Sequence, residues 1–161
     1  SFEWLIDFFR SIPVTALFPL FLIFFGFGDS AKIAMGVWAG GFVIMINTMH
    51  GVWSAKASRK QMALTKRLSY IQILTQITFY EALPYIFTGL RVGLSWTLIV
   101  IIVAEMFIGT ELGLGKLIYD ASTIFDTAKV IAAIFIIGSV GYLINKIVLL
   151  IEKKVVHWKG K

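Results

Sequence analysis

The side chains that most often carry out chemistry in proteins are scarce in this sequence and lie far apart. It contains no cysteine and two histidines, His50 and His157, which fall in different segments of the chain. Thiolate metal sites are therefore excluded, and the positions of the histidines suit neither a metal pair nor axial haem ligation. The glycine-rich segment 109–115 is not a phosphate-binding loop, because no Gly-Lys-Ser/Thr follows it. We expect no catalytic residue, no metal and no cofactor bound by this chain.

Three polar residues in long apolar runs remain as candidates for a functional site: Asn47, Arg91 and Glu105. Ionisable side chains within membrane spans are costly and commonly mark the pathway of a transported solute. Arg91 and Glu105 are 14 positions apart, about 21 Å along a helix, so they cannot pair with each other. Two alternatives stay open. Asn47 and His50 could instead hydrogen-bond across a helix interface, and Glu105 could be an anchor at the membrane surface.

Composition indicates that long apolar helices hold these residues. Apolar residues make up 58% of the 161 positions, charged residues 15%, and the mean hydropathy is +0.86. A soluble domain would carry roughly 25% charged residues. Four apolar segments approach the ~20 residues needed to cross a bilayer, and they cover about 11–28, 31–53, 82–108 and 128–152. We therefore predict an all-α fold, a polytopic transmembrane bundle of four spans that forms a single domain over residues 1–161.

Prolines and glycines predict how the first two spans pack. Pro13 and Pro19 would each cost about 3 kcal/mol in a helix interior in water, and membrane helices tolerate them when neighbours satisfy the backbone. We interpret the first span as a kinked packing helix, with a gating hinge as the alternative. Ser30 is expected to cap the second span. Small residues give that span a face that another helix can approach closely; they are Gly36, Gly40 and Gly41.

The charge distribution predicts the orientation in the membrane. Segment 54–67 holds five basic residues and no acidic one, and the tail 146–161 has five lysines against Glu152. Acidic residues outnumber lysines in segment 105–129. Lys and Arg stay on the cytoplasmic side, so we place 54–81 and the C-terminus inside and 105–129 outside. This rule explains the net charge of +6 better than nucleic-acid binding does.

Segment 54–81 is expected to form two short cytoplasmic helices. Ser58 and Ser69 each begin a Ser-x-x-Gln capping box, which predicts helices over about 58–66 and 69–78 with a break near Arg67. Pro84 suits the first turn of the next span. A plain solvated loop is the alternative, because basic residues here would attract anionic lipid by about 1 kcal/mol each without any partner. On the outer side, 116–125 is predicted as a further short helix.

A family resemblance appears where these pieces meet. The chain has a span, then a short cytoplasmic helix pair, then a span that begins with Pro. This order resembles the permease subunits of ABC importers that use a binding protein, and among them the nitrate/sulfonate/taurine/bicarbonate branch. The residues that carry the resemblance include Glu81-Ala82-Leu83-Pro84 through Arg91, Ala104-Glu105-Met106 and Gly113-Leu114-Gly115. Permeases of this branch usually have six spans, so we expect the chain to correspond to the last four.

The resemblance implies a docking role for the basic segment. In the family, a Glu-Ala-Ala motif followed by Gly forms the coupling helix that docks into the ATP-hydrolysing subunit. Alignment places this motif on Gln61-Met62-Ala63 and the Gly position on Arg67. Arg departs from the pattern, and at positive φ it costs roughly 1 kcal/mol or more. The residues that the resemblance assigns to coupling are Gln61, Met62, Ala63, Arg67, Leu68 and Ser69.

By the same resemblance, the chain is expected to be the permease of an ATP-driven importer for a small anionic or polar solute. Expected partners are cytoplasmic ATP-binding subunits that carry the ATP and Mg, an extracytoplasmic solute-binding protein, a second permease copy and membrane lipid. The expected location is the inner or plasma membrane, as a multi-pass protein. The alternative from another class is a non-transporting membrane anchor or scaffold subunit that holds a soluble partner.

Overall fold

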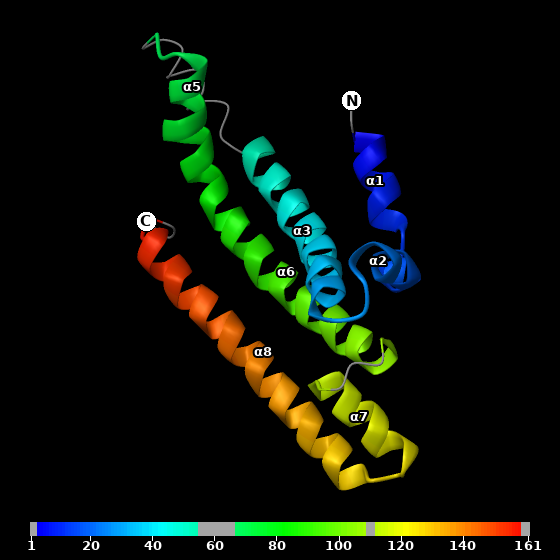
Figure 1. Cartoon of the computed structure of the whole chain (residues 1–161). Coiled ribbons are helices and arrows are strands. Elements are labelled where there is room, and N and C mark those ends of the chain that lie inside the picture. The colour runs from blue at the N-terminus through cyan, green and yellow to red at the C-terminus, as the bar shows by residue number, and fades with distance from the viewer. Residues whose placement is uncertain (1–2, 55–66, 109–111, 159–161) are drawn as a thin grey trace.

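The computed structural model describes residues 3–54, 67–108 and 112–158, and it confirms the all-α prediction (Figure 1). Within these residues the ordered elements are all helical. In chain order they are α1 (Glu3–Ser11), the 3-10 turn η1 (Val14–Leu17), α2 (Phe18–Phe25), α3 (Asp29–Trp53), α5 (Tyr70–Ile73), the π-helical turn η2 (Leu74–Thr78), α6 (Phe79–Phe107), α7 (Leu114–Thr123) and α8 (Thr127–Val155).

Three of the described helices are long and apolar enough to cross a membrane on their own. These are α3, the continuous helix Tyr70–Phe107 and α8. A fourth crossing exists if the bent pair Trp4–Ser11 and Val14–Phe25 counts as one span. The predicted bundle is therefore confirmed, and the number of spans is three or four.

The first span, predicted as a kinked helix over about 11–28, is bent in the structure, and the bend lies at the start of this range. α1 ends at Ser11, and the chain bends by 79° before Val14–Phe25. Pro13 explains the break, because its ring fixes φ and it has no N–H to continue the helix; its backbone is extended, with φ −60° and ψ 126°. Pro19 causes no break, since it lies in the first turn of α2, where prolines are tolerated.

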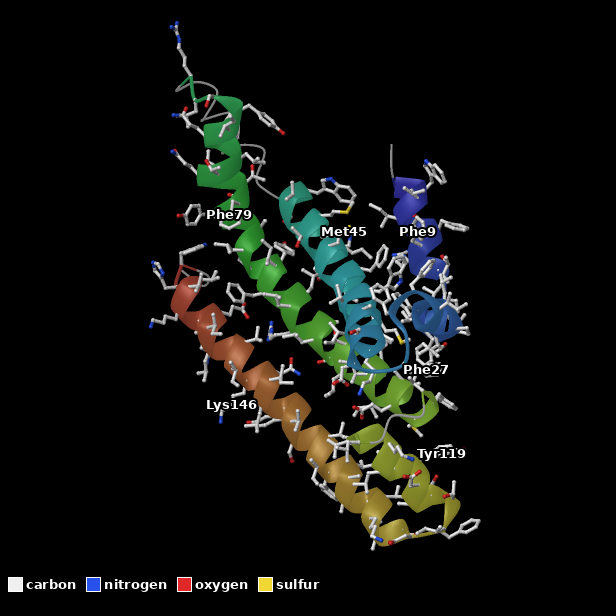
Figure 2. All side chains as sticks on the ribbon, in the orientation of Figure 1. Phe9, Phe27, Met45, Phe79, Tyr119 and Lys146 are labelled. Carbon is white, nitrogen blue, oxygen red and sulfur yellow. The ribbon has the colours of Figure 1, made fainter. Side chains whose placement is uncertain are left out.

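Trp38 holds the bent segment against α3. Its ring centroid lies 5.9 Å from that of Phe9 on α1 and 6.2 Å from that of Phe21 on α2, both edge-on. Figure 2 shows Phe9 on the side of α1 that faces α3. Edge-to-face aromatic pairs add about 0.5–1.5 kcal/mol beyond simple burial. The aromatic cluster therefore fixes the position of a segment that the proline has interrupted.

α3 and α6 form the principal helix pair, and glycines set their close approach. A Cβ at Gly40 would collide with the Thr97 hydroxyl and lie 2.9 Å from the Gly93 carbonyl oxygen. Thr97 Oγ1 also donates a 2.9 Å hydrogen bond to the Gly36 carbonyl across the interface. The predicted small-residue face is confirmed for Gly36 and Gly40. It is wrong for Gly41, which has open space beside its Cα.

The helix that begins at Tyr70 continues without a break to Phe107, and two predictions fail there. No separate helix ends near residue 78, and Pro84 lies inside α6 instead of at its start. The wide turn η2 joins α5 to α6, with the Phe79 N–H bonded to the Leu74 carbonyl. Membrane helices accommodate an internal proline when local adjustments satisfy the freed backbone groups. The Thr88 hydroxyl donates to the Pro84 carbonyl at 2.9 Å, which is an ordinary bond to the residue four positions earlier in the helix.

The bundle has two chemically different ends. We call the end with Trp53, Arg67 and Val155 the basic end, and the end with Asp29, Glu105 and α7 the acidic end. α5 extends past the end of α3 at the basic end, whereas α7 packs between α6 and α8 at the acidic end (Figure 1). The outer short helix predicted at 116–125 is observed as α7, shifted by two residues.

Helix starts differ from expectation in one more place. The predicted cap Ser30 lies inside α3, which begins at Asp29 after Gly28. α8 does have a side-chain cap, because Asp126 accepts a 3.1 Å hydrogen bond from the Lys129 N–H. Hydrogen bonds from the Lys129 side chain and backbone lower the pKa of Asp126. The pKa of Asp126 is therefore lower in the folded state than in the unfolded state. The cap then stabilises the folded state at neutral pH, and this stabilisation is lost as pH falls through the folded-state pKa.

Candidate functional site

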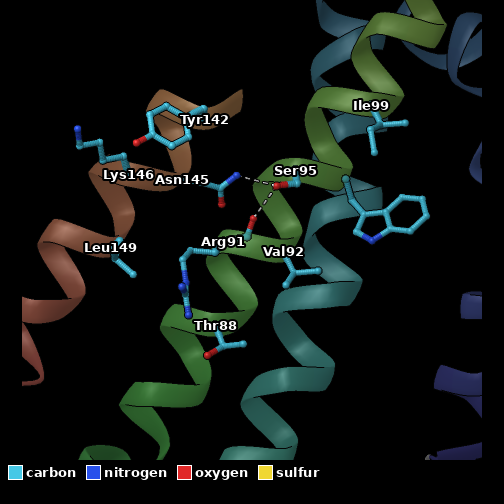
Figure 3. A pocket seen from close by; sticks show the side chains of 10 residues that line it. Thr88, Arg91, Val92, Ser95, Ile99, Tyr142, Asn145, Lys146 and Leu149 are labelled. Carbon is cyan, nitrogen blue, oxygen red and sulfur yellow. Dashed lines mark hydrogen bonds between the residues drawn. The ribbon is translucent and has the colours of Figure 1, made fainter. Parts of the chain in front are cut away.

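A cavity of about 710 Å³ lies between α6 and α8, and Arg91 is part of its wall. Figure 3 shows Asn145 of α8 pointing toward Ser95 of α6, whereas Lys146 and Tyr142 point away from α6. Six polar residues are among those that line the cavity. They are Thr88, Arg91 and Ser95 from α6, and Tyr142, Asn145 and Lys146 from α8. Arg91 and Lys146 are both among the residues that line this cavity, and we take it as the candidate site.

Cross-helix contacts position these side chains, because α6 and α8 run antiparallel. Asn145 Nδ2 donates to Ser95 Oγ at 3.0 Å, and Ser95 Oγ donates to the Arg91 carbonyl at 3.1 Å (Figure 3). One turn further toward the basic end, Arg91 Nη2 lies 3.5 Å from Glu152 Oε2. Beyond that, the rings of Tyr80 and Trp158 are 5.6 Å apart. These contacts tie the two helices together from the cavity to the basic end.

The electrostatics of the cavity favour an anion. Arg91 and Lys146 contribute two positive charges, and Glu152 beside the cavity contributes one negative charge. Guanidinium, ammonium, hydroxyl and amide groups are all hydrogen-bond donors. A planar guanidinium binds carboxylate-like oxygens in pairs, which gives such sites both affinity and geometric selectivity. The arrangement therefore has the chemistry to bind a small oxyanion.

Glu105 lies elsewhere, in a compact polar cluster at the acidic end. Its carboxylate accepts a 2.9 Å hydrogen bond from the Gly115 N–H and lies 3.7 Å from Lys32 Nζ. The side chains of Lys32 and Glu105 are only 9% and 13% exposed. Lys32 also contacts Asp29 at 2.7 Å. The cluster joins α3, α6 and α7 through charges that are largely removed from water.

Glu105 does for α7 what a capping residue normally does. α7 begins after Gly113, which has no side chain to satisfy the free N–H groups of the first turn. The Glu105 carboxylate supplies the acceptor, and a negative charge at a helix N-terminus is favourable. A Cβ at Gly113 would collide with that carboxylate, and one at Gly115 would collide with the Ile102 carbonyl oxygen. The glycines of this link therefore make room for Glu105.

The structure does not bring the three predicted pathway residues together. Asn47 donates to the carbonyl of Val43 in its own helix, and it packs against Gly89 where α3 meets α6. Arg91 lies on the α8-facing side of α6, and Glu105 is at the acidic end. A bond of Asn47 across the helix interface, the alternative, is not among the described hydrogen bonds. Arg91 is the candidate that the cavity supports.

The predicted coupling residues fall into two groups. Gln61, Met62 and Ala63 lie outside the described residues. Arg67, Leu68 and Ser69 are described, and they lie at the tip of the basic end. Arg67 has φ +55°, so Arg occupies the left-handed conformation for which glycine would be suited. Ser69 and Gln72 form the predicted capping box, with Ser69 N–H donating to Gln72 Oε1 at 2.9 Å and Gln72 N–H to Ser69 Oγ at 3.4 Å.

Sequence reasoning missed the charged partners of both sites. Lys32 and Glu152 lie near the ends of their helices, where a charge needs no explanation because it can reach the membrane surface. Both are buried. A signal was available, since α6 and α8 must run antiparallel if 105–129 is the connection between them. That arrangement brings the middle of α6 opposite the second half of α8.

A comparison with protein families gives the affiliation of the chain. Residues 1–157 match the family described as binding-protein-dependent transport system inner membrane component. The chain belongs to this family. Its relatives are ABC importer permeases of the nitrate/sulfonate/taurine/bicarbonate branch, as the sequence resemblance implied.

Individual relatives agree with this assignment. The permease is 29% identical to the taurine transport system permease protein of Escherichia coli, over 98% of the chain and 57% of the relative. It is 32% identical to the nitrate import permease protein of Synechocystis sp., over 94% of the chain and 55% of the relative. It is 34% identical to the bicarbonate transport system permease protein of Synechococcus elongatus, over 92% of the chain and 54% of the relative. The chain thus spans about half the length of the curated relatives it matches.

Proposed function

We propose that this permease forms, with a second copy, the membrane pathway of an importer for a small anionic or polar solute. An extracytoplasmic binding protein delivers the solute, and separate cytoplasmic subunits bind ATP and Mg and hydrolyse the ATP. The single observation that carries the proposal is the helix Tyr70–Phe107, which links the exposed tip of the basic end to the wall of the cavity.

The length of this helix supports a coupling role. Its 38 residues span about 57 Å, whereas the hydrocarbon core of a bilayer is ~30 Å thick. A substantial part of the helix must therefore extend beyond the hydrocarbon. Since the helix is continuous, a displacement of its tip by a partner is transmitted to Arg91 and Ser95 without an intervening loop. Rigid-body movement of this kind is a common means of switching between conformations.

The tip also has the character of a docking surface. Arg67 supplies a positive charge, and the neighbouring apolar side chains of Tyr70, Ile71 and Leu74 are exposed. Apolar side chains beside a charge, on a rigid capped helix, suit binding in a cleft of a soluble protein. We therefore assign the basic end to the cytoplasm and to the ATP-hydrolysing subunits. The C-terminus then lies inside, and the acidic end faces the binding protein.

The cavity supports an anionic solute. The relatives named above are permeases for nitrate, bicarbonate and taurine, and each of these solutes carries oxygens with negative charge. Arg91 and Lys146 match that chemistry, because a guanidinium and an ammonium group both donate hydrogen bonds to anionic oxygens. Within the architecture, Arg91 is the residue that we expect to contact the solute directly.

A substitution at the tip tests the docking assignment. Ile71→Asp places a negative charge in the proposed interface. The partner would remove water from this carboxylate without providing it with a counter-charge, which is unfavourable. We expect the ATP-hydrolysing activity that co-purifies with the tagged permease to fall at least tenfold. Leu112→Asp is the matched control, because Leu112 is similarly exposed, 85% against 70%, but lies at the acidic end. Equal loss in both variants, or none in either, would contradict the assignment.

A further inference from the structure

We infer that Glu152 is a resident counter-ion of Arg91, which leaves the guanidinium when a solute anion binds and so determines which anions are accepted. This inference rests on the proposed function, because it assumes that the cavity between α6 and α8 is the solute pathway. It adds a residue from α8 whose role is to compete with the solute.

The geometry of the pair is that of a loose contact. Arg91 Nη2 and Glu152 Oε2 are 3.5 Å apart, whereas charge-assisted N–H···O bonds are typically about 2.7–2.9 Å long. The Arg91 Nε–H is buried and has no acceptor among residues 3–54, 67–108 and 112–158. A guanidinium has five N–H donors, so this contact uses little of its capacity. An anion with two oxygens could form paired bonds that include the Arg91 Nε–H.

Burial explains why a counter-ion is needed when no solute is present. The Glu152 side chain is 9% exposed and the Arg91 side chain is 31% exposed. A charge without a partner is strongly unfavourable in such surroundings, whereas exchanging one anion for another keeps the local charge balanced. Glu152 therefore lowers the free energy of the site when no solute is bound. An incoming anion must bind Arg91 more strongly than Glu152 does in order to replace it.

This competition predicts a selectivity. Nitrate and sulfonate present oxygens spaced for paired hydrogen bonds with a guanidinium, and chloride presents a single centre. Oxyanions can therefore replace the Glu152 carboxylate with a gain in hydrogen bonding, and chloride cannot. Lys146 stays in the cavity wall in either case, and it contributes attraction that does not depend on the shape of the anion.

Anion binding to the complete permease in lipid nanodiscs tests the inference, with sodium nitrate, sodium methanesulfonate and sodium chloride as the probes. Binding is measured by titration calorimetry and as the rise of the thermal unfolding midpoint with anion concentration. We expect Glu152→Gln to bind nitrate and methanesulfonate about tenfold more tightly than the wild type, with a smaller change for chloride. Arg91→Gln/Glu152→Gln should lose this gain.

The second readout keeps the test valid if Glu152→Gln is less stable without an anion. In that case nitrate should restore its unfolding midpoint more than it raises that of the wild type. If nitrate binds through Arg91 but Glu152→Gln does not bind it more tightly than the wild type, the counter-ion role is overturned. The proposed function would still stand. Absence of binding by the wild type and by Glu152→Gln alike would overturn both the counter-ion role and the anionic solute.

Discussion

Replacing Lys32 with Met is expected to lower the free energy of unfolding by about 3 kcal/mol, because it leaves the Glu105 carboxylate buried without its ammonium partner. Breaking one side of a buried ion pair usually costs about 3–5 kcal/mol. We place Lys32→Met at the lower end, since Glu105 keeps its hydrogen bond from the Gly115 N–H. Chemical unfolding of the purified permease, followed by tryptophan fluorescence, measures the change.

A double variant separates the loss of the pair from the loss of packing. Lys32→Met/Glu105→Gln removes both charges and keeps an oxygen that can accept from Gly115. It should recover most of the stability lost in Lys32→Met, because neutral replacement of a buried pair is often close to neutral in stability. Lys116→Met is the surface control, and loss of its ion pair with Asp120 should cost at most about 1 kcal/mol. Equal costs for Lys32→Met and Lys116→Met would contradict a buried pair.

Two adjacent glycines on α3 should respond oppositely to alanine. Gly40→Ala places a methyl group against the Thr97 hydroxyl and the Gly93 carbonyl, so α3 and α6 must move apart. Overpacking of this kind costs about 1–3 kcal/mol. Close packing is also the main source of helix association in a membrane, where the hydrophobic effect between helices is absent. The stability of Gly40→Ala should fall accordingly.

Gly41→Ala is the matched control, because its methyl group meets open space. Alanine is favoured over glycine in a helix by up to about 1 kcal/mol, so Gly41→Ala should be neutral or stabilising. The same unfolding measurement compares the two variants. If both lose stability to the same extent, the close crossing of α3 and α6 at Gly40 is incorrect.

The two glycines also show where sequence reasoning succeeds and where it stops. The apolar runs predicted the long helices, and the Ser-x-x-Gln pattern predicted the cap at Ser69, because both signals are local. Gly40 and Gly41 look alike in sequence. Consecutive residues point about 100° apart around a helix, so only the position of α6 decides which of the two is in the contact.

The charged clusters could not be predicted for the same reason. Lys32 and Glu105 come from different helices, as do Arg91 and Glu152, and their pairing depends on how the helices pack. Pro84 was expected to begin a helix, but the preceding turns of α5 and η2 continue into α6. Arg67 is the opposite case: aligning the family motif placed the glycine position there, and the backbone does adopt positive φ at that residue.

The central proposal is that ATP-hydrolysing subunits drive this permease through its basic end in response to a delivered solute. The most direct measurement is the ATPase rate of the reconstituted complex with and without the binding protein and its solute. The proposal predicts a severalfold higher rate when both are present, and loss of that stimulation in Ile71→Asp. Equal rates with and without binding protein and solute would contradict it and would favour a non-transporting membrane anchor.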